Sequence, residues 1–316
     1  MEMVLLQLVL MAAGFVLLIK GADIFVKGAS AIAHKLGVPQ IVIGLTVVAM
    51  GTSAPEAAVS ISAALSGNAD ITIGNVVGSN IMNIFVVLGI TALVAPLIVD
   101  RSAVKVDMPV MFGITLLLLP FGLLGGSVNR WEGLILLAVF TAYMVYLFRQ
   151  AMKSRDEEAE NRPTYGQGNA WTIFLTVAGL VMIVIGSRLT VYSATEIAEF
   201  LGVSQRMIGL TVVAFGTSLP ELVTSVTAAR RGNTGIAIGN IVGSNVFNIL
   251  FVTGLTAVIT PIAFLSKFTF DLLVAALAAL LLWLFSWKFG YLNRICGLIF
   301  VLLYAGYFAV IIMNLI

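Results

Sequence analysis

Ten apolar runs, each of about 20 residues or more, recur along the 316-residue chain and restrict its fold more than any other feature. A helix of about that length crosses a hydrocarbon core about 30 Å thick with all of its backbone hydrogen bonds made internally. The composition agrees, since 60% of the residues are hydrophobic and 10% are charged. We therefore predict an all-α integral membrane protein with ten transmembrane helices. They are expected at residues 3–33, 40–66, 71–95, 106–125, 131–152, 171–200, 204–230, 236–261, 269–287 and 292–315.

The chain also repeats itself at an offset of 165 residues. Residues 44–56 and 209–221 are identical at eleven of thirteen positions, and the same offset maps residues 73–80 onto residues 238–245 without a gap. Chance does not produce such a match. The duplication covers at least the first three runs of each half.

A hydrophilic linker separates the two halves, because residues 153–168 contain seven charged side chains and end in Pro and Gly positions. We therefore divide the chain into a first five-helix repeat, residues 1–152, and a second, residues 169–316. The duplicated motifs occupy residues 44–91 and 209–256. An odd number of spans per repeat makes the second copy enter the membrane from the opposite side, which gives an inverted-topology repeat.

The basic residues predict the orientation of the chain. If the N-terminus is extracellular, eleven of the 17 Lys and Arg residues lie in cytoplasmic loops and three in the opposite loops. This bias places both termini outside the cell and the chain in the cell membrane. The eleven are Lys35, Arg101, Lys105, Arg149, Lys153, Arg155, Arg162, Arg230, Arg231, Lys288 and Arg294.

Glu56 and Glu221 are the acidic residues that lie deepest within apolar runs. A charged group at that depth is costly unless it meets a partner or a water-filled cavity, so function is its default explanation. Each follows a proline, which lacks an N–H and leaves the carbonyl four residues earlier without a helical donor. We predict that both helices break at the sequence Gly-Thr-Ser-x-Pro-Glu and line an ion site at the membrane midplane.

Oxygen ligands surround both glutamates in the sequence. Thr52 and Ser53 precede Glu56 by four and three residues, and Ser79 and Asn83 add a hydroxyl and an amide from the next run. The second repeat offers Thr217, Ser218, Glu221, Ser244 and Asn248. A hard cation such as Ca2+ takes about six to eight oxygen ligands of these kinds.

These segments resemble the alpha repeats of the cation/Ca2+ antiporter superfamily, in its prokaryotic Na+/Ca2+ exchanger branch. The resemblance rests on Gly-Thr-Ser-x-Pro-Glu at 51–56 and 216–221, and on Gly-Asn-x-x-Gly-Ser-Asn at 74–80 and 239–245. It implies a secondary active antiporter that exchanges Na+ for Ca2+ by alternating access. It also implies that Glu56 binds Ca2+ with its counterpart in the second repeat.

The resemblance extends to the individual ligands. It implies that the backbone carbonyls of Thr52 and Thr217 join the glutamates around Ca2+. It implies that Na+ uses the same glutamates with Ser53, Ser79, Ser218, Ser244 and the carbonyls of Ala49 and Ala214, and that Asn83 and Asn248 complete the centre. Some relatives, including K+-dependent exchangers, carry aspartate where this chain has Asn248, so it implies K+-independent exchange. The family's habit of binding more than two Na+ implies an electrogenic cycle.

Other functions fit the sequence less well. A Ca2+/H+ exchanger is the main alternative, although that branch usually has a different motif around its glutamates. A channel also uses carboxylates and carbonyls, but the inverted repeat favours a carrier. An intramembrane protease needs a histidine beside a serine or paired aspartates, and His34 is peripheral. His34 and the lone Cys296 also argue against zinc or copper. We expect Ca2+, Na+ and lipid as partners, and neither a cofactor, nucleic acid nor an obligate protein partner.

Overall fold

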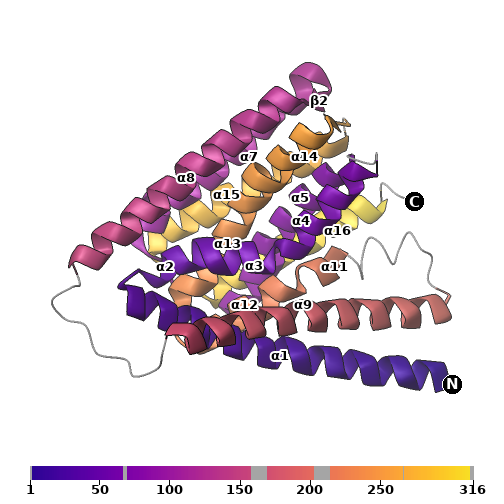
Figure 1. The fold of residues 1–316 in the computed structure, drawn as a ribbon. Coiled ribbons are helices and arrows are strands. Elements are labelled where there is room, and N and C mark those ends of the chain that lie inside the picture. Colours follow the sequence, from indigo (N-terminus) through magenta and orange to yellow (C-terminus); the bar gives the residue numbers. More distant parts are fainter. Residues whose placement is uncertain (1, 67–69, 158–168, 203–213, 266, 314–316) are drawn as a thin grey trace.

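The computed structural model describes residues 2–66, 70–157, 169–202, 214–265 and 267–313, which form helices joined by short turns and four two-residue strands (Figure 1). The predicted all-α class is confirmed. Eight described helices are long and apolar enough to cross a membrane, and a bent pair, Gln40–Thr52 with Ala54–Leu65, brings the number to as many as nine. The remaining expected span, residues 204–230, lies partly on residues 203–213, which are outside the described residues.

The first half consists of α1 (Glu2–Leu36), α2 (Gln40–Ile43), η1 (Gly44–Val48), α3 (Ala49–Thr52), α4 (Ala54–Leu65), α5 (Asp70–Met82), η2 (Asn83–Leu88), α6 (Gly89–Val94), β1 (Leu97–Ile98), η3 (Ala103–Asp107), α7 (Met108–Gly125), β2 (Ser127–Val128) and α8 (Arg130–Glu157). The second half consists of α9 (Asn169–Phe200), α11 (Ala214–Thr217), α12 (Leu219–Arg230), α13 (Thr234–Phe247), η6 (Asn248–Thr253), α14 (Gly254–Ile259), β3 (Ile262–Ala263), α15 (Lys267–Phe289), β4 (Tyr291–Leu292) and α16 (Arg294–Met313). The η segments are π-helical. Helix α8 continues beyond the expected fifth span into residues 153–157.

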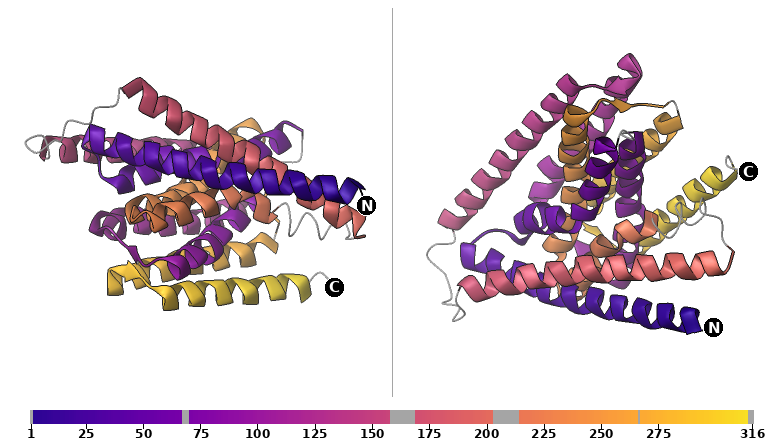
Figure 2. Two further views of the ribbon diagram at one scale, coloured as in Figure 1. Left: turned by 90° about the horizontal axis from the view of Figure 1, so that it is seen from below. Right: turned by 45° about the vertical axis from the view of Figure 1, so that its right-hand side comes forward.

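Helices α5 and α13 form the centre of the molecule. Helix α13 is buried from Gly235 to Phe247, whereas outer helices expose large apolar side chains such as Leu5, Trp131 and Leu302. Figure 2 shows α1 and α9 on one side of this centre and α16 on the other. An apolar exterior around a buried polar centre is the arrangement that a lipid environment requires.

Helices α1 and α9 pack side by side because glycines on both let their backbones approach closely (Figures 1 and 2). A Cβ at Gly28 would lie 2.1 Å from Oγ1 of Thr176. In the centre, a Cβ at Gly239 would lie 2.6 Å from the carbonyl oxygen of Ile41. The small-residue faces of the two repeats are therefore not equivalent, because a Cβ at Gly74, the counterpart of Gly239, would have no atom nearer than 3.5 Å.

Several tertiary features occur twice, once in each half. Tyr143 donates a hydrogen bond to Oδ1 of Asp107 at 2.8 Å, and Tyr307 donates one to Oδ1 of Asp271 at 2.9 Å. Both members of the second pair are 164 residues beyond those of the first. The strands show the same pattern, since β1 pairs with β4 and β2 pairs with β3. The duplication therefore extends beyond the three runs that the sequence motifs mark.

Candidate cation site

Both glutamates lie in the first turn of a helix that begins after a break. The chain leaves helical geometry at Ser53, with φ −85° and ψ 6°, and at Ser218, with φ −88° and ψ 2°. Glu56 is then the third residue of α4, and Glu221 the third residue of α12. The predicted breaks are confirmed at these two positions. A helix N-terminus favours a negative charge, so each break provides a favourable field for its carboxylate.

The two carboxylates are fully buried and only partly hydrogen-bonded. Glu56 and Glu221 each have 0% of their surface exposed. Ser53 of the first half donates to Oε1 of Glu221 at 2.8 Å, which brings the two breaks together. Both carboxylate oxygens of Glu56 and Oε2 of Glu221 have no hydrogen-bond partner among the described residues. Burying such groups is costly unless cations or protons neutralise them.

Four asparagines connect α5 and η2 to α13 and η6 at the centre. Asn80 donates to the carbonyl oxygen of Asn245 at 3.2 Å, and Asn245 donates to that of Asn80 at 3.2 Å. Asn83 donates to Oδ1 of Asn245 at 3.0 Å, and Asn248 donates to Oδ1 of Asn80 at 3.2 Å. These bonds occupy the amide N–H groups. The Oδ1 atoms of Asn83 and Asn248 are buried without a partner among the described residues, so both remain available as acceptors.

A second pair of asparagines holds the helices that carry the glutamates. Asn75 donates to Oγ of Ser60 at 2.9 Å and to the carbonyl oxygen of Glu56 at 3.1 Å. Asn240 makes the equivalent bonds to Ser225 at 2.9 Å and to Glu221 at 3.4 Å. No role is predicted for these asparagines from the sequence. The sequence signal that could have identified them is that asparagine occupies the same place in both copies of the motif.

The other predicted ligands differ in burial and in hydrogen bonding. Ala49, Ser53, Ser79, Ser218 and Ser244 are buried, and Oγ of Ser218 has no hydrogen-bond partner among the described residues. Oγ of Ser244 lies 3.5 Å from the carbonyl oxygen of Ala49. The hydroxyl of Thr52 lies 2.9 Å from Oδ1 of Asn240 and 3.1 Å from the carbonyl oxygen of Val48, so its proton is already used. Thr217 is half-buried, and the side-chain surroundings of Ala214 lie outside the described residues.

This set of oxygens suits a hard cation. Six unpartnered oxygens lie on five of the predicted residues: two on Glu56, and one each on Glu221, Asn83, Asn248 and Ser218. The described residues contain no group of three or more His, Cys, Asp and Glu side chains that would hold a metal ion. The centre therefore combines two carboxylates with neutral oxygens, which is a Ca2+ or Na+ donor set and not a zinc donor set.

A cavity of about 780 Å3 reaches the breaks from the surface. It is lined by residues along the length of α4, by α9 and by α11. Its inner end includes Pro55, directly before Glu56, and Thr217. Its outer part includes Ser62 and Ser66. The cavity therefore reaches residues close in sequence to both glutamates, while the two glutamates themselves stay buried beyond it.

Comparisons with known proteins agree across both halves of the chain. The family described as sodium/calcium exchanger protein matches residues 6–149 and, separately, residues 171–313. Sodium/calcium exchanger MaX1 of Methanosarcina acetivorans is 34% identical over 351 residues, which cover 98% of this chain and 99% of that protein. Inner membrane protein YrbG of Escherichia coli is 36% identical over 293 residues, covering 88% of this chain and 89% of that protein.

A solved structure is similar over the same extent. That of the sodium-calcium exchanger NCX_Mj, soaked with zero Na+ and Ca2+, superimposes with a TM-score of 0.85 at 32% sequence identity. The match covers 98% of this chain and 99% of that one. The similarity therefore includes the broken helices, the central helices and the outer pair together.

Proposed function

Because this chain belongs to the sodium/calcium exchanger protein family, we propose that it is a secondary active antiporter that exchanges Na+ for Ca2+ across the cell membrane. Membership makes it a multi-pass membrane transporter of ions and not an enzyme. The observation that carries the proposal is the buried pair Glu56 and Glu221, surrounded by unpartnered oxygens. Two carboxylates without a basic partner among the described residues need cations, and the neutral oxygens provide the remaining ligands.

The two ions are proposed to compete for one centre. Glu56 and Glu221 bind Ca2+ with the backbone carbonyls of Thr52 and Thr217, since the hydroxyl of Thr52 is already hydrogen-bonded. Na+ ions use the same carboxylates with further oxygens, which are the side chains of Ser53, Ser79, Ser218, Ser244, Asn83 and Asn248 and the carbonyls of Ala49 and Ala214. Competition couples the two fluxes, because the site carries one kind of ion in each direction.

Alternating access is proposed to follow from the duplication. The two repeats, residues 1–152 and 169–316, have inverted topology and are joined by the linker 153–168. Each contributes a broken helix to the midplane, and each provides a route to one side of the membrane. With both termini extracellular, the cavity beside Ser66 opens outward. The structure then corresponds to the state that exchanges ions with the outside.

The charge of the site predicts an electrogenic and K+-independent cycle. Two carboxylates balance one Ca2+ or two Na+, and the neutral oxygens provide room for a third Na+. Each charge that crosses the full potential contributes about 2.3 kcal/mol per 100 mV. Ca2+ uptake into Na+-loaded vesicles should therefore accelerate when the interior is made positive. Uptake that needs Na+ but ignores a clamped potential would show that only two Na+ move.

Transport in proteoliposomes tests the proposal. Purified protein is reconstituted, and Ca2+ uptake is measured with an outward Na+ gradient, an outward H+ gradient or neither, at a clamped potential. We expect uptake only with the Na+ gradient, and no requirement for K+. Uptake that follows the pH gradient and persists without Na+ would identify a Ca2+/H+ exchanger instead, because protons can also neutralise the two glutamates.

A further inference from the structure

The cavity that leads to the site contains a fixed positive charge. Arg188 of α9 is the only charged side chain among the described residues that line it. On the same helix turn, Ser187 donates to the carbonyl oxygen of Gly216 at 3.0 Å. That bond anchors this part of α9 beside Thr217, at the inner end of the cavity. The described residues provide no hydrogen bond or ion pair for Arg188, whose side chain is exposed.

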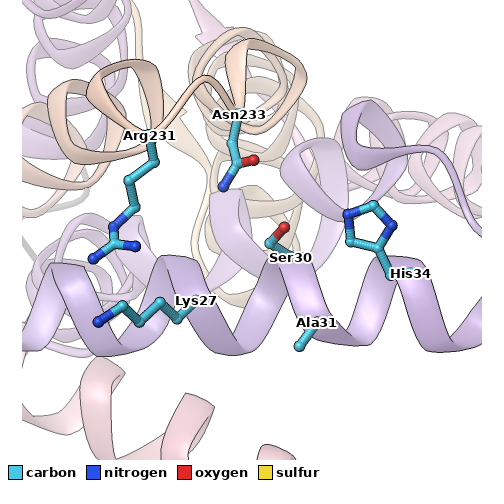
Figure 3. Close-up of a pocket in the computed structure, with 6 residues that line it drawn as sticks. All are labelled: Lys27, Ser30, Ala31, His34, Arg231 and Asn233. Carbon is cyan, nitrogen blue, oxygen red and sulfur yellow. The ribbon is translucent and has the colours of Figure 1, made fainter. Parts of the chain in front are cut away.

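The equivalent position in the first repeat is different. Arg188 is 165 residues beyond Asp23, which forms ion pairs with Arg231 and, at 2.9 Å, with Lys27. Figure 3 shows Lys27 of α1 and Arg231 from the end of α12 beside the same pocket of about 250 Å3. The residue equivalent to Arg231 is Ser66, which has no charge. Arg188 therefore stands in an open cavity without the counter-charge that its equivalent has.

We propose that Arg188 is a specificity-determining residue that disfavours Ca2+ relative to Na+ on the route from the cavity to the site. This inference rests on the proposed function. A positive charge in a cleft with low-dielectric walls lowers the local concentration of every cation. The penalty is proportional to ion charge, so the factor for a divalent ion is the square of the factor for a monovalent ion. Arg188 thereby lets Na+ compete with Ca2+ on the side where the cavity opens.

Neutralising this charge should change the two apparent affinities by related factors. In water, a unit charge about 15 Å away alters the local concentration of a monovalent cation about 1.6-fold and of a divalent cation about 2.5-fold, before screening by salt. In Arg188→Gln we therefore expect the half-saturating Ca2+ concentration to fall by at most about 2.5-fold and that of Na+ by at most about 1.6-fold at low ionic strength, and both by less at higher salt. Charge reversal in Arg188→Glu should square both factors.

The experiment compares right-side-out and inside-out membrane vesicles. Half-saturating Ca2+ and Na+ concentrations are measured from each face for the original chain and for Arg188→Gln, Arg188→Glu and Arg188→Lys. The control is Arg149→Gln, which removes an exposed arginine on α8 that does not line the cavity. Ca2+ binding to the purified protein in detergent gives a readout that is independent of turnover.

We expect the half-saturating concentrations to change from one face only, with the factor for Ca2+ equal to the square of the factor for Na+. Arg188→Lys and Arg149→Gln should keep the original values. Added choline chloride should make the changes smaller. Equal factors for both ions, equal changes from both faces, or an Arg188→Lys variant that behaves like Arg188→Gln would overturn it. Failure of the proposed function is a separate result, because it shows as absent Na+-dependent Ca2+ flux in the original chain.

Discussion

At the scale of single residues, we propose that the site depends on two carboxylates that neutral groups cannot replace. In Glu56→Gln or Glu221→Gln, half of the formal charge and the bidentate capacity of one ligand are lost. Loss of one partner from a buried charged centre is severe, so exchange should fall on the order of 100-fold or more. Na+-driven Ca2+ uptake by reconstituted protein measures the effect.

Asp107→Asn is the matched control for those two variants. Asp107 is also fully buried in a membrane helix, but it is hydrogen-bonded to Tyr143 and is not part of the site. An asparagine oxygen still accepts that hydrogen bond, so we expect transport near the original rate. Normal exchange in either glutamine variant, or an equal loss in Asp107→Asn, would contradict the assignment of the site.

Residue types and spacing supplied the proposed ligands of the centre but not the hydrogen bonds that connect the residues around them. Glu56 and Glu221 could be identified because acidic residues are rare within apolar runs. The reciprocal bonds between Asn80 and Asn245 could not, because they cross between halves that are 165 residues apart. A motif shows that both asparagines are present, whereas their pairing depends on how α5 packs against α13.

At the scale of elements, close packing around the two central helices is asymmetric, which provides a stability test. Gly78 and Gly243 are equivalent in sequence, but a Cβ at Gly243 would lie 2.6 Å from the carbonyl oxygen of Leu45. We expect Gly243→Ala to reduce stability by about 1–3 kcal/mol, as overpacked cores do. Gly78→Ala meets nothing within 4 Å and should be neutral or stabilise the helix by up to about 1 kcal/mol. Thermal unfolding in detergent distinguishes them, and equal melting temperatures would refute this packing asymmetry.

Helix breaks were predictable from sequence, whereas other local elements were not. Proline removes a donor, but Pro120 lies inside the continuous helix α7, so a proline alone does not end a helix. The breaks near Pro55 and Pro220 coincide with the whole repeated sequence Gly-Thr-Ser-x-Pro-Glu. The π-helical segments that begin at Asn83 and Asn248 have no comparable signal, because their geometry depends on what surrounds them. Such segments occur frequently at functional sites, and here each begins at a predicted ligand. The two-residue strands are likewise products of tertiary contact.

At the scale of the whole molecule, a cavity approaches the site on one side, whereas an ion pair occupies the equivalent position on the other side. A cavity reaches the site beside α4 and α9, while Asp23 of α1 is ion-paired with Arg231 at the end of α12 on the equivalent path. If the proposed alternating access operates, this ion pair stabilises the state in which that second path is closed. Its loss should therefore increase the population of the opposite state.

Asp23→Asn tests this expectation through two single cysteines in a chain whose Cys296 is replaced by alanine. Ala58→Cys reports the open cavity, and Val223→Cys, at the equivalent position 165 residues later, reports the closed path. A partly exposed ion pair contributes about 0.2–1 kcal/mol, so a reagent for thiols should modify Cys at position 223 about 1.4–5-fold faster. Modification at position 58 should slow.

Two controls accompany this test. Lys27→Gln keeps the bond between Asp23 and Arg231 and should change both modification rates little. The charge-reversed double variant Asp23→Arg with Arg231→Asp should restore the original rates. Faster modification at both positions would indicate local loosening of the helices, and unchanged rates would show that the ion pair does not favour either state.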